Sequence, residues 1–173
     1  IPDAKCSRYY FDIRKEKKAN TSGETFFSSN VAIIRALDVV LSLITTQGLD
    51  KLFHDIHRRA EFTRHFAQKL GFVLYAKSPS DSVTALTVPP QMDGQKIRLH
   101  LEEIHNITIM GGQDQAKGKI IRVGHMGYIQ DHEMVRLIEC LGHTLRHFDP
   151  DFMSLEHISN IATEAKNWLE QNP

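Results

Sequence analysis

Residues 31–44, VAIIRALDVVLSLI, form a long apolar run with the length of a helix. Arg35 and Asp38 are its only charged residues, and their spacing lets them pair on one side of a helix. The rest of the circumference is apolar or small, which is typical of a helix buried between two bodies. The run is too short and too charged to span a membrane. We therefore predict a central helix packed on both faces, with part of its natural packing partner missing from this chain.

A second helix is predicted directly after Gln47 and Gly48, because apolar residues return at helical spacing on one face while charged residues occupy the other. Gly71 ends this helix. The pattern indicates a half-exposed helix. Its apolar positions are Leu49, Leu52, Phe53, Ile56, Ala60, Thr63, Ala67 and Leu70.

Short β-prone runs alternate with further helical patterns along the rest of the chain. The predicted strands are residues 72–75, 83–88, 107–110 and 120–123. Asp93 and Asp131 are expected to cap two helices, and residues 152–169 to form a last amphipathic helix. This order predicts an α+β fold with a small, mainly antiparallel sheet and helices on one face.

The N-terminal stretch combines aromatic and charged runs. Residues 9–13 are β-prone, and we predict a short strand there. Residues 14–18, RKEKK, are predicted to form a solvated loop.

Residues 107–128 interleave two apolar runs with paired glycines, and a hairpin-like pair of strands is predicted there. Arg122 lies inside the second strand, between Ile121 and Val123. An arginine on a partly buried strand must meet an anion, because a desolvated charge without a partner is costly. The sequence leaves two interpretations open: an external anion, or a salt bridge to one of the chain's own carboxylates.

The start of the predicted helix at Val31 is the second candidate site. Ser28, Ser29 and Asn30 precede it, and no Asp or Glu lies in its first turn. Such a helix end can bind a phosphate through its unpaired N–H groups. Ordinary N-capping, which needs no ligand, is the alternative interpretation.

The composition narrows the function classes. The chain has 173 residues, enough for one domain or one with an appendage, and its 21 basic and 21 acidic side chains balance. This balance gives no indication of a nucleic-acid or membrane partner. Two cysteines, Cys6 and Cys140, are too few for a disulfide framework or a zinc site, and they fit a reduced, cytoplasmic protein. Because the chain begins with Ile1, we expect that an N-terminal part is missing.

Two pairs of histidines have the helical spacing that two metal ligands could use. Neither pair has the acidic neighbour of a metalloprotease helix or a third ligand nearby, so we predict no metal site and expect solvated helix histidines. The pairs are His54 with His57 and His143 with His147.

Two motifs carry a resemblance to a known family. IMGG at residues 109–112, followed by GKIIRVGHMG at 118–127, resembles the C-terminal signature of class V aminotransferases, in particular the alanine–glyoxylate and serine–pyruvate group. LSLITTQGL at 41–49 resembles a long helix and turn of the same enzymes. The resemblance covers residues 8–148 and extends to the small, or tritium-exchange, subunit of soluble hydrogenase, itself an aminotransferase relative.

The resemblance implies the C-terminal part of a fold-type-I, pyridoxal-phosphate-dependent enzyme that is usually a homodimer. Arg122 matches the arginine that holds the substrate's α-carboxylate, and Ser28 matches the hydroxyl residue that contacts the cofactor phosphate of the neighbouring subunit. Thr25 falls where many relatives have a tyrosine that also contacts the phosphate, and Asn30 where they have proline. The Schiff-base lysine of the family would lie upstream of Ile1, so no catalytic residue is assigned in this chain.

On this basis we expect a division into four segments. They are a remnant of the large cofactor domain at 1–28, a long interdomain helix at 29–48, the small domain at 49–148 and an appended helix at 149–173. The implied activity moves an amino group from a small amino acid, alanine or serine, to a 2-oxo acid such as glyoxylate or pyruvate. The alternative is a non-catalytic or hydrogenase-associated accessory subunit that keeps the fold.

Overall fold

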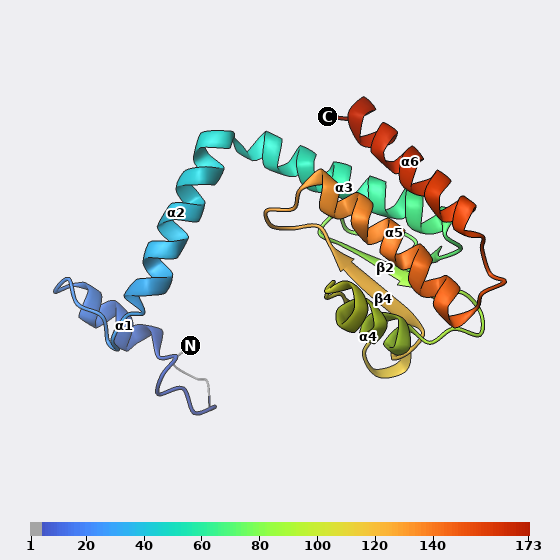
Figure 1. Cartoon of the computed structure of the whole chain (residues 1–173). Helices are drawn as coiled ribbons and strands as arrows, with labels where there is room; N and C mark the ends of the chain where they lie inside the picture. The colour runs from blue at the N-terminus through green and yellow to red at the C-terminus, as the bar shows by residue number, and fades with distance from the viewer. Residues whose placement is uncertain (1–4) are drawn as a thin grey trace. The chain divides into compact units, whose positions relative to one another are not determined.

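The computed structural model describes residues 5–173, which divide into two compact units at Gly48 (Figure 1). The first unit comprises residues 1–48 and the second residues 49–173.

The first unit begins with helix α1 (Ile13–Asn20). The strand predicted at 9–13 and the loop predicted at 14–18 are both wrong, because turn residues precede this helix and the charged run lies inside it. Asp12 explains the difference: its carboxylate accepts a hydrogen bond from the Arg14 backbone N–H at 3.1 Å and caps the first turn. The Arg14 guanidinium also binds this carboxylate, and the pKa of Asp12 is lowered to about 2.

Helix α2 (Val31–Gln47) follows, and it has the predicted start and end. The Asn30 side chain accepts from the Ile33 N–H at 3.1 Å, and Gly48 ends the helix with a φ of 91°. The predicted packing on both faces is not found, because no residue of α2 is buried in the described chain. Leu43, for example, is 58% exposed. Arg35 and Asp38 also form no ion pair among the described side chains.

No single helix of the described part is long and apolar enough to cross a membrane. Helix α2 and helix α3 (Leu49–Lys69) are long and apolar enough only when they are taken together across the break at Gly48.

The second unit contains a four-stranded antiparallel sheet and four α-helices. Its elements are α3 (Leu49–Lys69), β1 (Val73–Leu74), β2 (Val83–Thr87), α4 (Gly94–His105), β3 (Met110–Gly111), a 3-10 turn η1 (Asp114–Ala116), β4 (Ile120–Gly124), α5 (Asp131–Phe148) and α6 (Leu155–Gln171). The strand order is β1-β2-β4-β3, so β3 forms one edge. Strands β3 and β4 are antiparallel neighbours, as the predicted hairpin requires.

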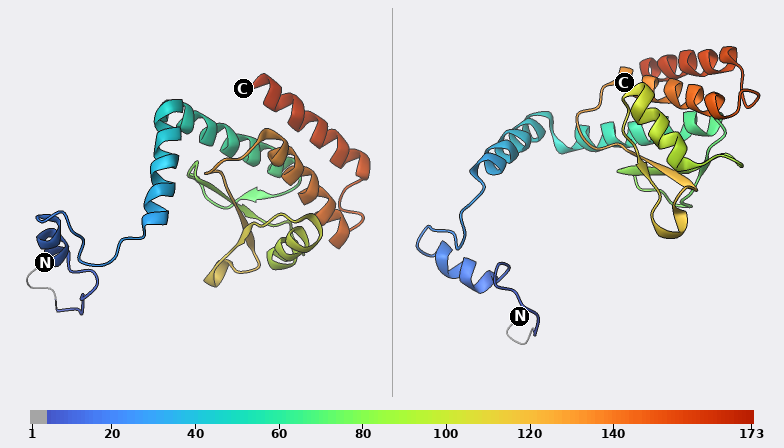
Figure 2. Two further views of the ribbon diagram at one scale, coloured as in Figure 1. Left: turned by 60° about the vertical axis from the view of Figure 1, so that its left-hand side comes forward. Right: turned by 60° about the horizontal axis from the view of Figure 1, so that its bottom comes forward.

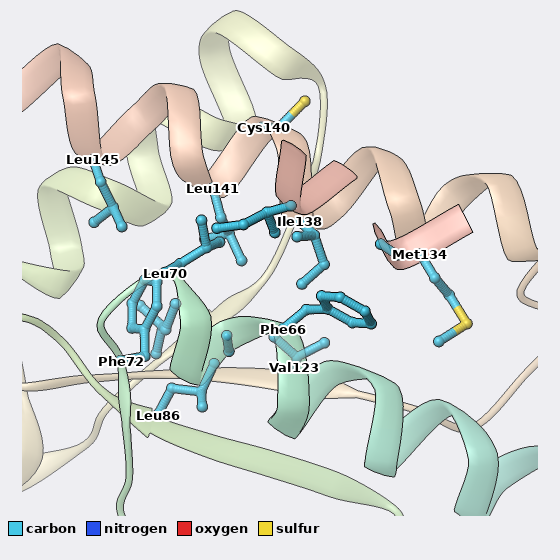
Figure 3. Packing of buried hydrophobic residues seen from close by; sticks show 14 of the residues in the cluster. Phe66, Leu70, Phe72, Leu86, Val123, Met134, Ile138, Cys140, Leu141 and Leu145 are labelled. Atoms are coloured by element: carbon cyan, nitrogen blue, oxygen red, sulfur yellow. The ribbon is translucent and has the colours of Figure 1, made fainter. Parts of the chain in front are cut away.

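One face of the sheet carries the core. Leu86 pairs with Ile121 in register, and both side chains are fully buried on this face. Helices α3 and α5 cover it with Phe66, Leu141 and other apolar side chains (Figure 3). Burying one such side chain contributes roughly 1.5 to 3 kcal/mol. The predicted α+β fold with helices on one face is confirmed.

Helices α5 and α6 lie side by side (Figure 2). Helix α6 contributes Ile158 and Leu169 to the same core, so this C-terminal helix is packed within the second unit. It begins at Leu155 after the cap Ser154, three residues later than the predicted start at 152.

The predicted caps of the two middle helices fare differently. Asp93 caps α4 as predicted, accepting from the Gln95 N–H at 2.7 Å. The cap of α5 is Gln130 and not Asp131, because the Gln130 N–H donates to Glu133 at 2.7 Å and Asp131 lies within the helix. Asp131 instead accepts three hydrogen bonds from the Arg58 guanidinium on α3.

Candidate functional site

Arg122 lies on the face of the sheet opposite the core. Side chains alternate along a strand, and its neighbours Ile121 and Val123 are buried under the helices. The register places Ala85 of β2 on one side of Arg122 and Met110 of β3 on the other. Met110 is 59% exposed and Arg122 is half-buried, so this row of neighbouring side chains is partly open to solvent within the second unit.

The Arg122 guanidinium has no carboxylate partner among residues 5–173, because no ion pair of the described chain includes it. Its one hydrogen bond there runs from Nε to the Gly111 carbonyl oxygen at 2.9 Å. An internal salt bridge therefore does not account for this arginine. A guanidinium has five N–H donors, so four remain for an anion.

A cavity of about 370 Å³ adjoins Arg122. It forms where the chain before β3 stops pairing with β4: the ladder begins at Met110, while β4 continues to Gly124. Its walls come from α3, α5 and the segments around β3 and β4. The polar residues in its lining include Arg59, Thr63, Asn106, Thr108, Glu133 and Arg136.

Two of the arginines in this lining are engaged in holding backbone. Arg59 Nη1 donates to the carbonyl oxygens of His125 at 3.2 Å and Gly127 at 3.1 Å, and so fixes the loop after β4. Arg136 donates to the carbonyl of His105. Arg122 differs from both, because neither of its terminal nitrogens is used within the part of the chain that the structure describes.

His125 is the buried titratable group next to this cavity, with 2% of its surface exposed. Its Nε2 lies 2.8 Å from the Thr84 hydroxyl. Burial, followed by the positive charges of Arg64 and Arg59, lowers the pKa of His125 to about 4. The imidazole is therefore neutral at pH 7. His125 was not among the site residues predicted from the sequence, although the motif shows a histidine directly after an apolar strand.

The second candidate site, at the start of α2, lies in the other unit. Thr25 donates from its hydroxyl to the Phe27 carbonyl at 2.7 Å, and Ser29 donates to the Thr25 hydroxyl oxygen at 3.3 Å. The hydroxyl of Ser28 is exposed and makes no hydrogen bond to any residue between 5 and 173. The structure thus brings Thr25 and Ser28 into one loop, with Thr25 engaged locally.

The donor set at this helix start fits a phosphate group. Asn30 caps the Ile33 N–H, and the N–H groups of Val31 and Ala32 have no partner in the described residues. No acidic residue lies in the first turn. A free hydroxyl beside unpaired N–H groups at a positive helix end is suited to an oxyanion.

The histidine pairs of α3 and α5 make ordinary contacts. His57 binds Asp81 at 2.8 Å, and His147 stacks on His100 of α4 with ring centres 4.3 Å apart. In the described part of the chain, no group of three or more His, Cys, Asp or Glu side chains could hold a metal ion.

No family model matches the chain, but individual relatives do. It is 33% identical over 140 residues to the soluble hydrogenase 42 kDa subunit of Anabaena cylindrica, covering 80% of this chain and 36% of that protein. It is 30% identical over 137 residues to the serine–glyoxylate aminotransferase of Methylorubrum extorquens, covering 78% of this chain and 34% of the relative. The chain therefore spans about a third of the length of these relatives.

Solved structures have the same fold. The ureidoglycine–glyoxylate aminotransferase of Bacillus subtilis matches with a TM-score of 0.81 and 19% identity, over 91% of this chain and 42% of that one. The alanine–glyoxylate aminotransferase of Nostoc sp. matches with a TM-score of 0.67 and 26% identity, over 70% of this chain and 33% of that one.

Proposed function

The chain is a homologue of the C-terminal portion of the class V aminotransferases, and from this premise we propose that it is the substrate-closing domain of such an enzyme. The proposed reaction moves the amino group of alanine or serine to glyoxylate or pyruvate. The observation that carries the proposal is Arg122, a half-buried guanidinium without a carboxylate partner in residues 5–173, on a strand that matches the family's signature.

Arg122 is proposed to bind the α-carboxylate of the amino acid. A guanidinium recognises a carboxylate through two parallel N–H···O bonds, which fix its orientation as well as its position. Arg122 lies on β4, which pairs with β2 on one side and with β3 on the other. The proposed carboxylate clamp is therefore built on a rigid element. The cavity that Arg122 helps to line also has Thr63 and Thr108 in its wall, and its Arg59 and Arg136 are engaged with backbone carbonyl oxygens.

Pyridoxal 5'-phosphate is the proposed cofactor, and when bound it supplies the electron sink that carries the nitrogen. Ser28, with the N–H groups of the first turn of α2, is proposed to bind its phosphate, and Thr25 to add a second contact. This phosphate would belong to the neighbouring subunit of a homodimer. The Thr25 contact requires its hydroxyl to leave the Phe27 carbonyl, so we expect Thr25 to contribute less than Ser28.

By itself the chain is proposed to be inactive. The family's chemistry requires a lysine held against the cofactor, and burial or a neighbouring positive charge can lower the pKa of such a lysine so that it becomes a free amine. Every lysine of this chain except the half-buried Lys15 is exposed. The purified chain with pyridoxal phosphate should form no stoichiometric coloured complex and transfer no nitrogen. A coloured complex with turnover would contradict this part of the proposal.

The test of the proposed function uses the complete protein. Nitrogen transfer from alanine or serine to glyoxylate or pyruvate should be measurable, and Arg122→Ala should reduce kcat/KM by roughly 30-fold or more, the loss of about 2 kcal/mol of binding. Arg98→Ala, an arginine on α4 paired with Glu102, is the matched control and should leave it nearly unchanged.

An accessory, hydrogenase-associated subunit is the second candidate, because some of the relatives are named soluble hydrogenase subunits. The two candidates differ in the upstream sequence. A lysine at the end of an upstream strand, together with measurable nitrogen transfer, favours the enzyme. Stable cofactor-free protein that transfers no nitrogen from any small amino acid favours the accessory role.

A further inference from the structure

The Arg122 Nε–H donates its hydrogen bond to a backbone carbonyl of the edge strand β3, that of Gly111. Gly112 donates its N–H to the Ile120 carbonyl, and Met110 pairs with Arg122, so these two rungs are the hydrogen-bonded pairs of the β3–β4 ladder. Such pairs alternate with pairs that are not hydrogen-bonded. Gly111 is therefore in the other kind of pair, with its N–H and C=O directed away from β4.

Because β3 is the edge of the sheet, the Gly111 carbonyl faces its free edge. The Arg122 side chain must cross over β3 to reach it, and the 2.9 Å bond holds the guanidinium there through Nε. A guanidinium can receive a carboxylate along the Nε–Nη edge or along the edge between its two Nη atoms. With Nε engaged, the edge between the two Nη atoms remains.

The Gln95 side chain of helix α4 lies close to Gly111. A Cβ placed on Gly111 would lie 3.2 Å from Gln95 Oε1, at the first turn of α4. On the next residue, a Cβ at Gly112 would lie 2.1 Å from the Ala116 carbonyl oxygen, so the turn after β3 tolerates only glycine there.

The first residue of α4, Gly94, packs against the connection between β3 and β4. The Gly94 N–H donates to the Gly118 carbonyl at 2.7 Å, and a Cβ on Gly94 would lie 2.9 Å from the Ile120 carbonyl oxygen. Helix α4 and the β3–β4 connection are thus in backbone contact at Gly94. Close packing at Gly94, Gly111 and Gly112 thus surrounds the strand segment that carries the Gly111 carbonyl.

We propose that Gly111 is a positioning residue for Arg122. Its carbonyl fixes Nε, so the α-carboxylate of the substrate binds end-on along the two Nη atoms. This inference rests on the proposed function for its ligand, whereas the positioning itself is a property of this chain and can be measured without cofactor or activity.

The direct test is nuclear magnetic resonance of the Arg122 Nε–H in the 173-residue chain, assigned by its loss in Arg122→Lys. We expect its hydrogen exchange to be slowed by about tenfold relative to a free guanidinium, the effect of one hydrogen bond of about 1.4 kcal/mol. Gly111→Val should abolish the protection, because its branched side chain meets Gln95. The double variant Gly111→Val with Gln95→Ala should restore it.

Gly111→Ala is the matched control, since the flexible end of Gln95 can yield to one methyl group and protection should persist. If Gly111→Val does not fold, the parent spectrum still decides. An unprotected Nε–H in the parent, or full protection in folded Gly111→Val, overturns the proposal.

In the complete protein, Gly111→Val should raise KM for the amino acid by roughly tenfold and change kcat less than about twofold, since only carboxylate orientation is altered. Lower kcat at constant KM would overturn the positioning role. The two proposals fail separately. A protected Nε–H with normal KM in Arg122→Ala contradicts the proposed function alone, whereas an unprotected Nε–H with raised KM in Arg122→Ala contradicts the positioning alone.

Discussion

Leu141 on α5 is fully buried, whereas Leu43 on α2 is 58% exposed, although both are leucines in the middle of well-formed helices. The same contrast separates the two units. In residues 49–173 apolar positions from four helices and the sheet meet in one core. In α2 no apolar side chain is buried within the described chain. An apolar pattern thus predicts a helix, but it does not predict the surface that covers the helix, and in the described residues α2 is left exposed.

This difference assigns different tasks to the two units. The second unit has its own core and can hold Arg122 rigidly, as a substrate clamp requires. Helix α2 has an apolar surface that is costly to expose, at roughly 25 cal/mol per Å². Its natural state in the proposed complete enzyme is between other surfaces, with Ser28 at its start.

The largest expected effect is on stability, when each of the two leucines is replaced by alanine. Leu141→Ala should lower the free energy of unfolding of the chain by about 3 kcal/mol, because it leaves a cavity in the core. Leu43→Ala should change it by less than about 0.5 kcal/mol, since that side chain is in solvent. Urea denaturation of both variants measures the difference. Equal losses would show that α2 is covered in solution.

The next effect is the pH dependence of folding stability, which arises from the buried His125 in the second unit. A histidine whose folded pKa is lowered from 6.5 to about 4 stabilises the fold above pH 6.5, and that contribution is lost as the pH falls toward 4. Burial of His125 should therefore make the chain about 2 kcal/mol less stable at pH 5 than at pH 7.

Urea denaturation at several pH values measures this loss. His125→Gln should remove most of the slope, while His132→Gln, at an exposed position on α5, should keep it. His100 and His105, whose pKa values are also lowered by burial, would account for a smaller residual slope of the same sign. A parent protein with no slope between pH 7 and 5 would contradict the buried, neutral state of His125.

The smallest effect concerns the first unit. Ser28→Ala in the complete dimer should weaken cofactor binding by about 1 kcal/mol, the loss of one hydrogen bond to a phosphate shared with backbone N–H groups. Amino-acid binding should change little. Ser22→Ala is the control, because that hydroxyl bonds the Ala19 carbonyl. Equal cofactor affinity in parent and Ser28→Ala would show that Ser28 does not bind the cofactor phosphate and only precedes the cap residue Asn30.

Much of the second unit could be predicted from the sequence, because its strands and helices have periodic patterns and are stopped by glycine or capped by Asp93. The first unit was harder. At Asp12 a single capping carboxylate outweighs an aromatic run and starts α1, which no periodicity indicates. The exposure of α2 could not be predicted either, since a pattern does not say which surface covers it.

The candidate site divides in the same way. Arg122 was predictable, because a charge among buried isoleucines stands out in sequence. The Gly111 carbonyl that holds it was not, because backbone direction depends on strand register and on which strand is the edge. His125 was visible in the motif, but its lowered pKa follows from burial that only the packed fold produces.

The central claim is that Arg122 is reserved for the carboxylate of the substrate. The measurement that tests it most directly is amino-acid affinity of the complete, cofactor-loaded protein, compared between parent, Arg122→Lys and Arg122→Ala. Because an ammonium cannot make the two-point contact, both variants should lose about 2 to 3 kcal/mol of binding, with cofactor affinity unchanged. Unchanged amino-acid affinity in Arg122→Ala would contradict the account.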